Sequence, residues 1–118
     1  MNRVANGATL GNRALQTAEV DNVATALADL RPGEIELLRP ERVESFALVQ
    51  AVRSGHKLAI ESIVVDEPVV KLGVPIGRAT RDIASGEWVH LHNCASYLDE
   101  KSSSLDLESG LPTDSEYE

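Results

Sequence analysis

Two of the three histidines in this 118-residue sequence are separated by one residue, in the segment GEWVHLHN at positions 86–93. If residues 87–92 form a β-strand, the alternation of side chains places Trp88, His90 and His92 on one face. The two histidine Cα atoms would then be about 6.5–7 Å apart. At that spacing both imidazoles could reach one metal ion at about 2.1 Å. The segment therefore predicts a two-point metal chelate that needs a further ligand; the alternative is two polar side chains on an exposed strand face.

The third histidine, His56, follows a glycine in the segment SGHKLAI. Gly55 predicts a turn with unusual backbone angles. His56 is therefore either an ordinary turn residue or a third ligand that joins His90 and His92, which requires the turns of the chain to gather at one end of the fold. Cys94 follows the histidine pair and is interpreted as a buried thiol, with a soft metal ligand as the alternative.

Two cations flank a glycine-containing segment, KLGVPIGRAT at positions 71–80. Gly73 and Gly77 on either side of Pro75 predict a constrained loop. Lys71 and Arg78 beside such a loop could bind an anionic substrate, for example the carboxylate of a sugar acid. The alternative is a structural corner with exposed charges. The sequence contains no G-x-G-x-x-G, P-loop or C-x-x-C motif and no credible Ser-His-Asp arrangement.

Short apolar runs, separated by turn residues, must position these side chains. Five runs rich in Val, Ile or Leu predict strands at residues 34–38, 46–52, 57–65, 69–72 and 87–92. One short helix is expected after Asp21, because apolar residues at positions 23, 24, 27 and 30 are spaced for one helical face and Pro32 ends it. No long helix separates the strands, so the fold is predicted to be mostly β, without parallel crossover units.

A faint internal repeat indicates the same fold class. Four segments share an aliphatic residue, two variable positions, Gly or Asp, a polar residue and then a strand. They are LRPGEIEL (30–37), VRSGHKLA (52–59), IVVDEPVV (63–70) and IASGEWVH (83–90). The repeat predicts a small β-rich domain with tight, similar corners.

Composition indicates one folded domain between two polar ends. The hydrophobic fraction is 42% and the aromatic fraction 3%, so the core must be aliphatic, and a partner or oligomer would help to stabilise it. The domain is expected at residues 13–97. A flexible N-terminus (1–12) precedes it, and an acidic tail (98–118) follows that composition predicts to be disordered.

Charge and cysteine content exclude several classes of function. The net charge is −8, and residues 99–118 hold seven acidic residues against one lysine. The rest of the chain is therefore nearly neutral and has no basic patch for nucleic acid. A single cysteine forms no intrachain disulfide, and the sequence shows neither a signal peptide nor a membrane span. A cytoplasmic protein that binds neither membrane nor nucleic acid is expected.

Three stretches of the sequence resemble the N-terminal SAF-type domain of the altronate/galactarate dehydratase family: DNVATAL (21–27), GHKLAI (55–60) and VVKLGVPIGRATRDIASGEWVHLHN (69–93). The resemblance implies a β-clip fold with one or two short helices. It also implies dehydration of a sugar acid, altronate or galactarate, to a 2-keto-3-deoxy acid. The family further implies a divalent metal, iron or manganese.

The resemblance also implies partners and roles for individual residues. The chain resembles the small subunit of a hydro-lyase that is active only with a larger dehydratase subunit, which would supply the general base. His90, His92 and His56 would hold the metal, and Lys71 and Arg78 would bind the substrate; the catalytic residues of this chain are unknown. The alternatives are a subunit of a sulfolactate sulfo-lyase-like enzyme, a non-catalytic carbohydrate-binding or assembly module, and a homo-oligomeric enzyme with its site at a subunit interface.

Overall fold

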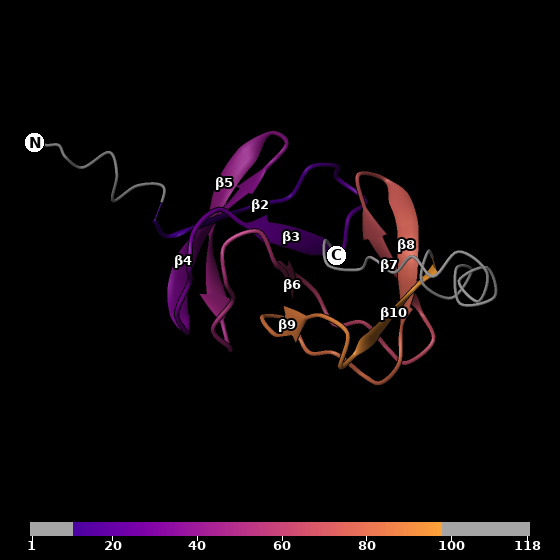
Figure 1. Ribbon diagram of the computed structural model, residues 1–118. Coiled ribbons are helices and arrows are strands. Elements are labelled where there is room, and N and C mark those ends of the chain that lie inside the picture. Colours follow the sequence, from indigo (N-terminus) through magenta and orange to yellow (C-terminus); the bar gives the residue numbers. More distant parts are fainter. Residues whose placement is uncertain (1–10, 98–118) are drawn as a thin grey trace, which may run out of the picture.

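Two β-sheets make up the part of the chain that the computed structural model describes, residues 11–97 (Figure 1). The larger sheet has six strands in the order β5-β4-β2-β3-β6-β9, and the smaller has three in the order β10-β8-β7. The mostly-β prediction is confirmed. In chain order the strands are β2 (Arg13–Leu15), β3 (Val23–Ala26), β4 (Gly33–Arg39), β5 (Arg42–Leu48), β6 (Lys57–Ala59), β7 (Pro68–Lys71), β8 (Val74–Ala79), β9 (Trp88–Val89) and β10 (Cys94–Ser96).

Strand pairing is antiparallel except between β2 and β4, which run parallel. The predicted runs at 34–38 and 69–72 correspond to β4 and β7, whereas β5 and β6 end before the predicted limits of 52 and 65. Residues 74–79, expected to form a constrained loop, instead form β8. The three-residue strands β2 and β10 were not predicted, because so short a strand carries too little alternation. The flexible N-terminus predicted at residues 1–12 lies outside the described residues except for positions 11 and 12. The acidic tail predicted at residues 98–118 lies wholly outside them.

No helix between residues 11 and 97 is long and apolar enough to cross a membrane.

The predicted helix after Asp21 is wrong, because Val23–Ala26 form the strand β3. This strand pairs antiparallel with β2 on one side and with β6 on the other. Three of its four residues are buried. A strand that is buried on both faces is nearly continuous in apolar residues, so its spacing also fits one face of a short helix. The two neighbouring strands, which local spacing does not reveal, decide in favour of the strand.

The four repeated segments share a corner with left-handed backbone conformation. The fourth residue of each has a positive φ: +131° at Gly33, +86° at Gly55, +76° at Asp66 and +91° at Gly86. Glycine adopts such angles without steric cost, and Asp tolerates them better than most residues. In three segments a backbone hydrogen bond closes the turn in the manner of a type II turn, from His56 N to Arg53 O, Glu67 N to Val64 O and Glu87 N to Ala84 O. The prediction of similar, tight corners is confirmed.

The aliphatic residues that open the four repeats pair with one another. Leu30 and Val52 form an isolated antiparallel bridge, and Ile63 and Ile83 form a second. Each pair exchanges two backbone hydrogen bonds of 2.8–3.0 Å, and none of the four residues is more than 2% exposed. The corners of the fold are therefore tied together in pairs.

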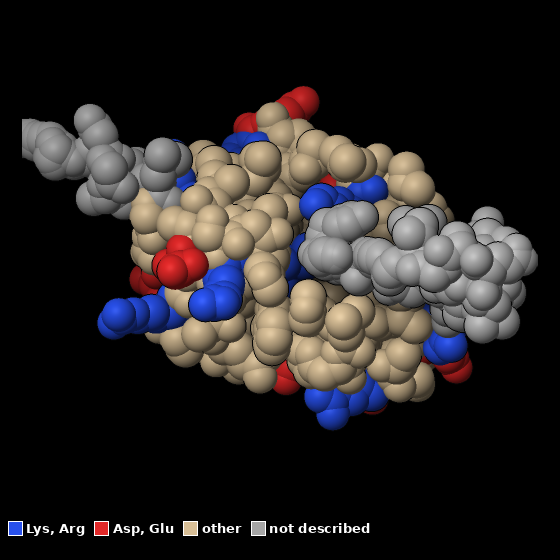
Figure 2. Space-filling model, viewed as in Figure 1, with Lys and Arg blue, Asp and Glu red and all other residues tan. Residues whose placement is uncertain are grey.

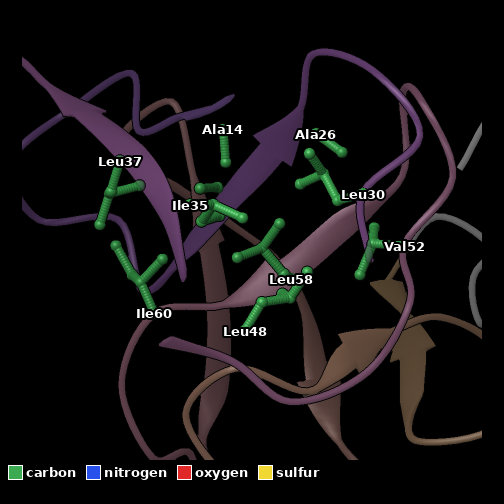
Figure 3. Packing of buried hydrophobic residues seen from close by; sticks show 10 residues of the cluster. Ala14, Ala26, Leu30, Ile35, Leu37, Leu48, Val52, Leu58 and Ile60 are labelled. Carbon is green, nitrogen blue, oxygen red and sulfur yellow. The ribbon is translucent and has the colours of Figure 1, made fainter. Parts of the chain in front are cut away.

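Each of these pairs lies in its own aliphatic core. The first core gathers side chains from the six-stranded sheet, among them Ile35, Leu37 and Leu58 (Figure 3). The second core joins the two sheets, because its members come from both. Cys94, predicted to be a buried thiol, belongs to this second core, whose members are Val23, Ala59, Ile63, Val69, Ala79, Ile83, Val89 and Cys94.

A buried carboxylate fastens the smaller sheet to the larger one. Asp21 is 3% exposed, and its oxygens accept hydrogen bonds from the backbone N–H groups of Ala18 (3.0 Å), Leu72 (2.9 Å) and Gly73 (2.8 Å). Leu72 and Gly73 form the turn between β7 and β8, and their φ angles of +58° and +75° are typical of a type I′ hairpin. The adjacent Asn22 bonds the backbone of β7 through both of its side-chain polar atoms. Asp21 thus caps a hairpin turn rather than a helix.

Replacing Asp21 by Asn should lower the free energy of unfolding by about 2–4 kcal/mol. An Asn amide loses the charge and turns its NH₂ group toward backbone N–H groups that need an acceptor. Urea unfolding, followed by the fluorescence of the single tryptophan, measures the change.

Asp29→Asn is the matched control for this substitution. Asp29 is exposed and accepts one hydrogen bond, from the backbone N–H of Ser54 at 2.9 Å. Its replacement should therefore cost less than about 1 kcal/mol, as is usual at exposed positions. Equal losses in the two variants would contradict the role assigned to Asp21.

Candidate functional site

The register between β6 and β9 brings His56 next to His90. Lys57 pairs with Val89, and Leu58 with Trp88. One step further along this antiparallel ladder, His56 lies opposite His90. Opposed residues on one face of a sheet have Cβ atoms about 4.5–5.5 Å apart, and side chains two residues apart share a face. The predicted gathering of the three histidines therefore begins with the pairing of two short strands.

Four aromatic rings form a contact cluster on this face, here called the ring cluster: His56, Trp88, His90 and His92. The centroids of His56 and His90 are 4.9 Å apart, with 30° between the ring planes. Trp88 stacks on His90 at 5.1 Å and 12°, and contacts His92 at 4.8 Å and 36°. The indole Nε1–H of Trp88 also donates a 3.2 Å hydrogen bond to His56 Nδ1. The ring cluster thus contains every histidine and the only tryptophan of the chain.

A buried asparagine holds the loop that carries His90 and His92. Strand β9 ends at Val89, so the predicted strand over residues 87–92 is wrong beyond that point, and the chain turns at residues 91–93. Asn93 is 2% exposed. Its Oδ1 accepts the backbone N–H of His90 at 2.9 Å, and its Nδ2 donates to the Trp88 carbonyl at 2.8 Å. This turn, and not strand alternation, sets the position of His92.

Trp88 is anchored through both its ring and its backbone. Its ring packs against the first core, and its backbone N–H donates to Gln50 Oε1 at 2.9 Å. The preceding corner is crowded, because a Cβ on Gly86 would lie 2.7 Å from the carbonyl oxygen of Ala47 in β5. The positive φ of Gly86 disfavours any other residue as well. The main chain that leads into the ring cluster is therefore fixed against the six-stranded sheet.

The ring cluster does not by itself form a metal site. A metal ion lies in the plane of each imidazole that binds it, about 2.1 Å from the nitrogen. The rings of His56 and His90 are stacked at 4.9 Å with only 30° between their planes, so these planes do not meet within that reach. Among residues 11–97, no three His, Cys, Asp or Glu side chains are grouped so as to hold a metal ion. The metal at these histidines stays a prediction, and it requires ligands beyond the described part of this chain.

The cluster can bind by stacking and by hydrogen bonding at its edges. His56, Trp88 and His90 are half-buried and His92 is exposed, so the rings lie at the surface. Aromatic faces pack against flat or apolar ligand surfaces, and ring N–H groups donate to oxygen acceptors. This combination suits a partner or ligand that carries both apolar and oxygen-containing groups.

The two predicted substrate-binding cations lie at opposite ends of one hairpin. Lys71 pairs with Val74 beside the β7–β8 turn, and Arg78 pairs with Pro68. They are separated by roughly 10 Å along the hairpin, from the rise per residue. Arg78 lies 3.5 Å from a carboxylate oxygen of Asp66. Across the view in Figure 2, basic and acidic side chains are interspersed on a mostly uncharged surface. Carboxylate binding by Lys71 and Arg78 stays a prediction.

Residues 12–97 match the family described as the altronate/galactarate dehydratase SAF domain. The chain belongs to this family. The altronate dehydratase of Bacillus subtilis (strain 168) is 41% identical to it over 78 residues, and the altronate dehydratase of Escherichia coli (strain K12) is 44% identical over 79 residues. The family predicted from the three sequence stretches is confirmed.

This SAF domain corresponds to a small part of those relatives. The aligned residues make up 66% and 67% of this chain but 15% of each altronate dehydratase. The (2R)-sulfolactate sulfo-lyase subunit alpha of Chromohalobacter salexigens is 45% identical over 53 residues, which are 45% of this chain and 56% of that subunit. Two kinds of lyase therefore contain a segment similar to this SAF domain.

Sequence reasoning missed two residues that position the ring cluster of this SAF domain. Asn93 follows His90 by three residues, and an asparagine side chain can bond backbone groups three residues earlier, which is a local signal of a turn closed by its side chain. The sequence gives no signal of the role of Gln50, because the Trp88 N–H from which it accepts a hydrogen bond lies 38 residues away. Only the fold brings these two groups together.

Replacing Asn93 by Asp should lower the free energy of unfolding by about 2–4 kcal/mol, because a buried carboxylate oxygen would then face the Trp88 carbonyl without a proton between them. Tryptophan fluorescence during urea unfolding reports the change at the affected site. Leu91→Ala, in the same turn, is the control, since Leu91 is 56% exposed and should cost no more than about 0.5 kcal/mol. A neutral Asn93→Asp variant would contradict the role of Asn93.

His92 should be neutral at pH 7, and its protonation in acid should lower the free energy of unfolding. Although His92 as a whole is exposed, desolvation of its ring by the neighbouring residues is the main cause that lowers its pKa from the ordinary value of 6.5; the positive charge of Arg81 acts in the same direction, and Glu87 opposes them only in part. The folded state therefore binds this proton less tightly than the unfolded chain does. The free energy of unfolding should decrease as the pH falls from about 6.5 through the folded pKa.

An NMR titration of the His92 ring tests the direction of this shift. Urea unfolding at a series of pH values tests its consequence, and His92→Gln should flatten that part of the profile. A His92 pKa at or above 6.5 in the folded chain would show that burial and Arg81 do not dominate.

Proposed function

We propose that this SAF domain is the small subunit of a sugar-acid hydro-lyase of the altronate or galactarate dehydratase type, which acts together with a larger catalytic subunit. The product would be a 2-keto-3-deoxy acid. The observation that carries the proposal is the family match over residues 12–97, together with identities of 41% and 44% to two altronate dehydratases. The aligned segment is 15% of each of those enzymes, and the proposal assigns the machinery of their remaining parts to the larger subunit. Similarity to a lyase component named as a subunit supports that arrangement.

The roles in the reaction divide between the two subunits. Dehydration of a sugar acid removes the proton α to a carboxylate and expels hydroxide from the β carbon. We assign the general base to the larger subunit. The divalent metal, iron or manganese, would stabilise the developing negative charge. It would need ligands from the larger subunit, since the described part of this chain offers no three-residue group.

This chain would contribute a covering surface and substrate contacts. The half-buried ring cluster is proposed to face the larger subunit, which would complete its burial and exclude water from the site. Lys71 and Arg78 are proposed to contact substrate carboxylates, for which charged, multidentate donors are well suited. Their separation along the β7–β8 hairpin favours contacts to two different groups over one shared carboxylate.

A second candidate has the same architecture and a different leaving group. The 45% identity to a (2R)-sulfolactate sulfo-lyase subunit alpha favours a lyase that expels sulfite in place of hydroxide. The same α-proton abstraction next to a carboxylate would serve both reactions. The ring cluster and the two cations do not distinguish these leaving groups.

Anaerobic purification of the tagged chain from its native cells should yield a stoichiometric complex with a larger protein that contains iron or manganese. The complex should convert altronate or galactarate into a 2-keto-3-deoxy acid, detected by mass spectrometry alongside intact masses and metal content. Release of sulfite from sulfolactate would select the second candidate.

The chain purified alone is the control, and it should turn over none of the three substrates. Metal-dependent turnover by the chain alone would overturn the two-subunit proposal in favour of a homo-oligomeric enzyme. A chain that elutes without a partner, metal or activity would instead identify a non-catalytic binding module.

A further inference from the structure

The hydrogen bond between Trp88 and His56 fixes where His56 carries its proton. The indole Nε1–H is a donor only, and it lies 3.2 Å from His56 Nδ1. His56 Nδ1 must therefore accept, with its lone pair directed at the indole. A neutral imidazole has one N–H and one bare nitrogen, so the ring proton of His56 lies on Nε2. The hydrogen bond made at one nitrogen sets the state of the other.

Both partners in this hydrogen bond are held by the fold, so neither is free to reorient. Trp88 packs against the first core, and the β6–β9 ladder and Gln50 hold its backbone. His56 ends a closed turn, with its N–H donated to Arg53 O at 2.9 Å and its carbonyl accepting from Ala26 N at 2.8 Å. Stacking on His90 further fixes the plane of the His56 ring.

This arrangement disagrees with the metal-binding role that the sequence predicts for His56. Coordination through Nδ1 would require the metal to displace the indole N–H. Coordination through Nε2 would move the proton to Nδ1 and set two N–H groups against each other across 3.2 Å. Either route breaks a hydrogen bond of a half-buried ring, which costs free energy that the metal would have to supply.

We propose that Trp88 is a positioning residue that keeps His56 out of metal coordination and makes its Nε2–H a hydrogen-bond donor to a carboxylate or hydroxyl oxygen. Nδ1 and Nε2 lie on different sides of the imidazole ring, so with Nδ1 on the indole the donor points away from Trp88. Any metal at the ring cluster is then left with His90, His92 and ligands from elsewhere. The inference concerns the chain alone and does not rest on the proposed function, so either can fail without the other.

Nitrogen NMR of the full chain, labelled with ¹⁵N-histidine, reads the tautomer directly at about pH 8, where an ordinary imidazole is neutral. His56 should show a bare Nδ1 and a protonated Nε2 as a single tautomer. Zn²⁺, used alone as a diamagnetic probe, should leave both His56 nitrogen signals unmoved over the range of concentrations that shifts His90 or His92. A protonated Nδ1, or zinc-induced shifts of His56 at those concentrations, would overturn the proposal.

The single tryptophan allows a matched variant that removes only the donor. Growth with benzothienylalanine replaces the indole N–H by sulfur and preserves the shape of the ring. His56 should then become a mixture of both tautomers and should respond to Zn²⁺, while the backbone amide signals of β6 and β9 stay in place. Trp88→Phe is the second variant and should act in the same direction. A His56 tautomer that is unchanged in both well-folded variants would show that Trp88 does not set it.

Discussion

Left-handed backbone conformation at one position of each repeated corner is the constraint on which the rest of this fold depends. At Gly33 the chain turns at the first residue of a strand, and at Gly55, Asp66 and Gly86 it turns two residues before one. In each case an aliphatic residue three positions earlier is buried. Since these aliphatic residues pair as Leu30 with Val52 and Ile63 with Ile83, each corner is tied to another. Paired corners allow strands as short as two residues to hold their place.

Polar side chains provide the connections that long strands supply in other β proteins. Asp21 gives three backbone N–H groups an acceptor and so attaches the β7–β8 turn to the larger sheet. Asn93 closes the turn after β9 by accepting a hydrogen bond from the His90 N–H and donating one to the Trp88 carbonyl. Both side chains are buried, and buried polar groups stabilise a fold only when their hydrogen bonds are satisfied. Asp21 and Asn93 therefore specify how the turns and strands are arranged, and add little apolar burial to the core.

The ring cluster is a direct product of the same corners. Gly55 lies directly before His56, and Gly86 lies two residues before Trp88. These two corners therefore lead into β6 and β9, which pair in a register that sets His56 opposite His90. His90 then stacks on His56 at 4.9 Å and on Trp88 at 5.1 Å, and His92 lies tilted against Trp88 at 4.8 Å. This geometry favours contact with a ligand or partner over convergence on one metal ion. In the proposed enzyme the larger subunit would supply the general base and the further metal ligands, since residues 11–97 group no three such side chains together.

The sequence by itself determined the family, the β-rich class and the four corners, because glycine or aspartate at a left-handed position leaves a local signature. It also singled out all three histidines of the site. Tertiary structure alone decided that Val23–Ala26 is a strand, since its two neighbours come from elsewhere in the chain. It alone decided that His56 meets Trp88 and His90, because a ladder between residues some 30 positions apart sets their separation. Local spacing predicts which residues can do chemistry. Hydrogen bonds between residues far apart in the sequence, such as that from Trp88 to His56 Nδ1, decide which atoms of those residues can still bind a ligand.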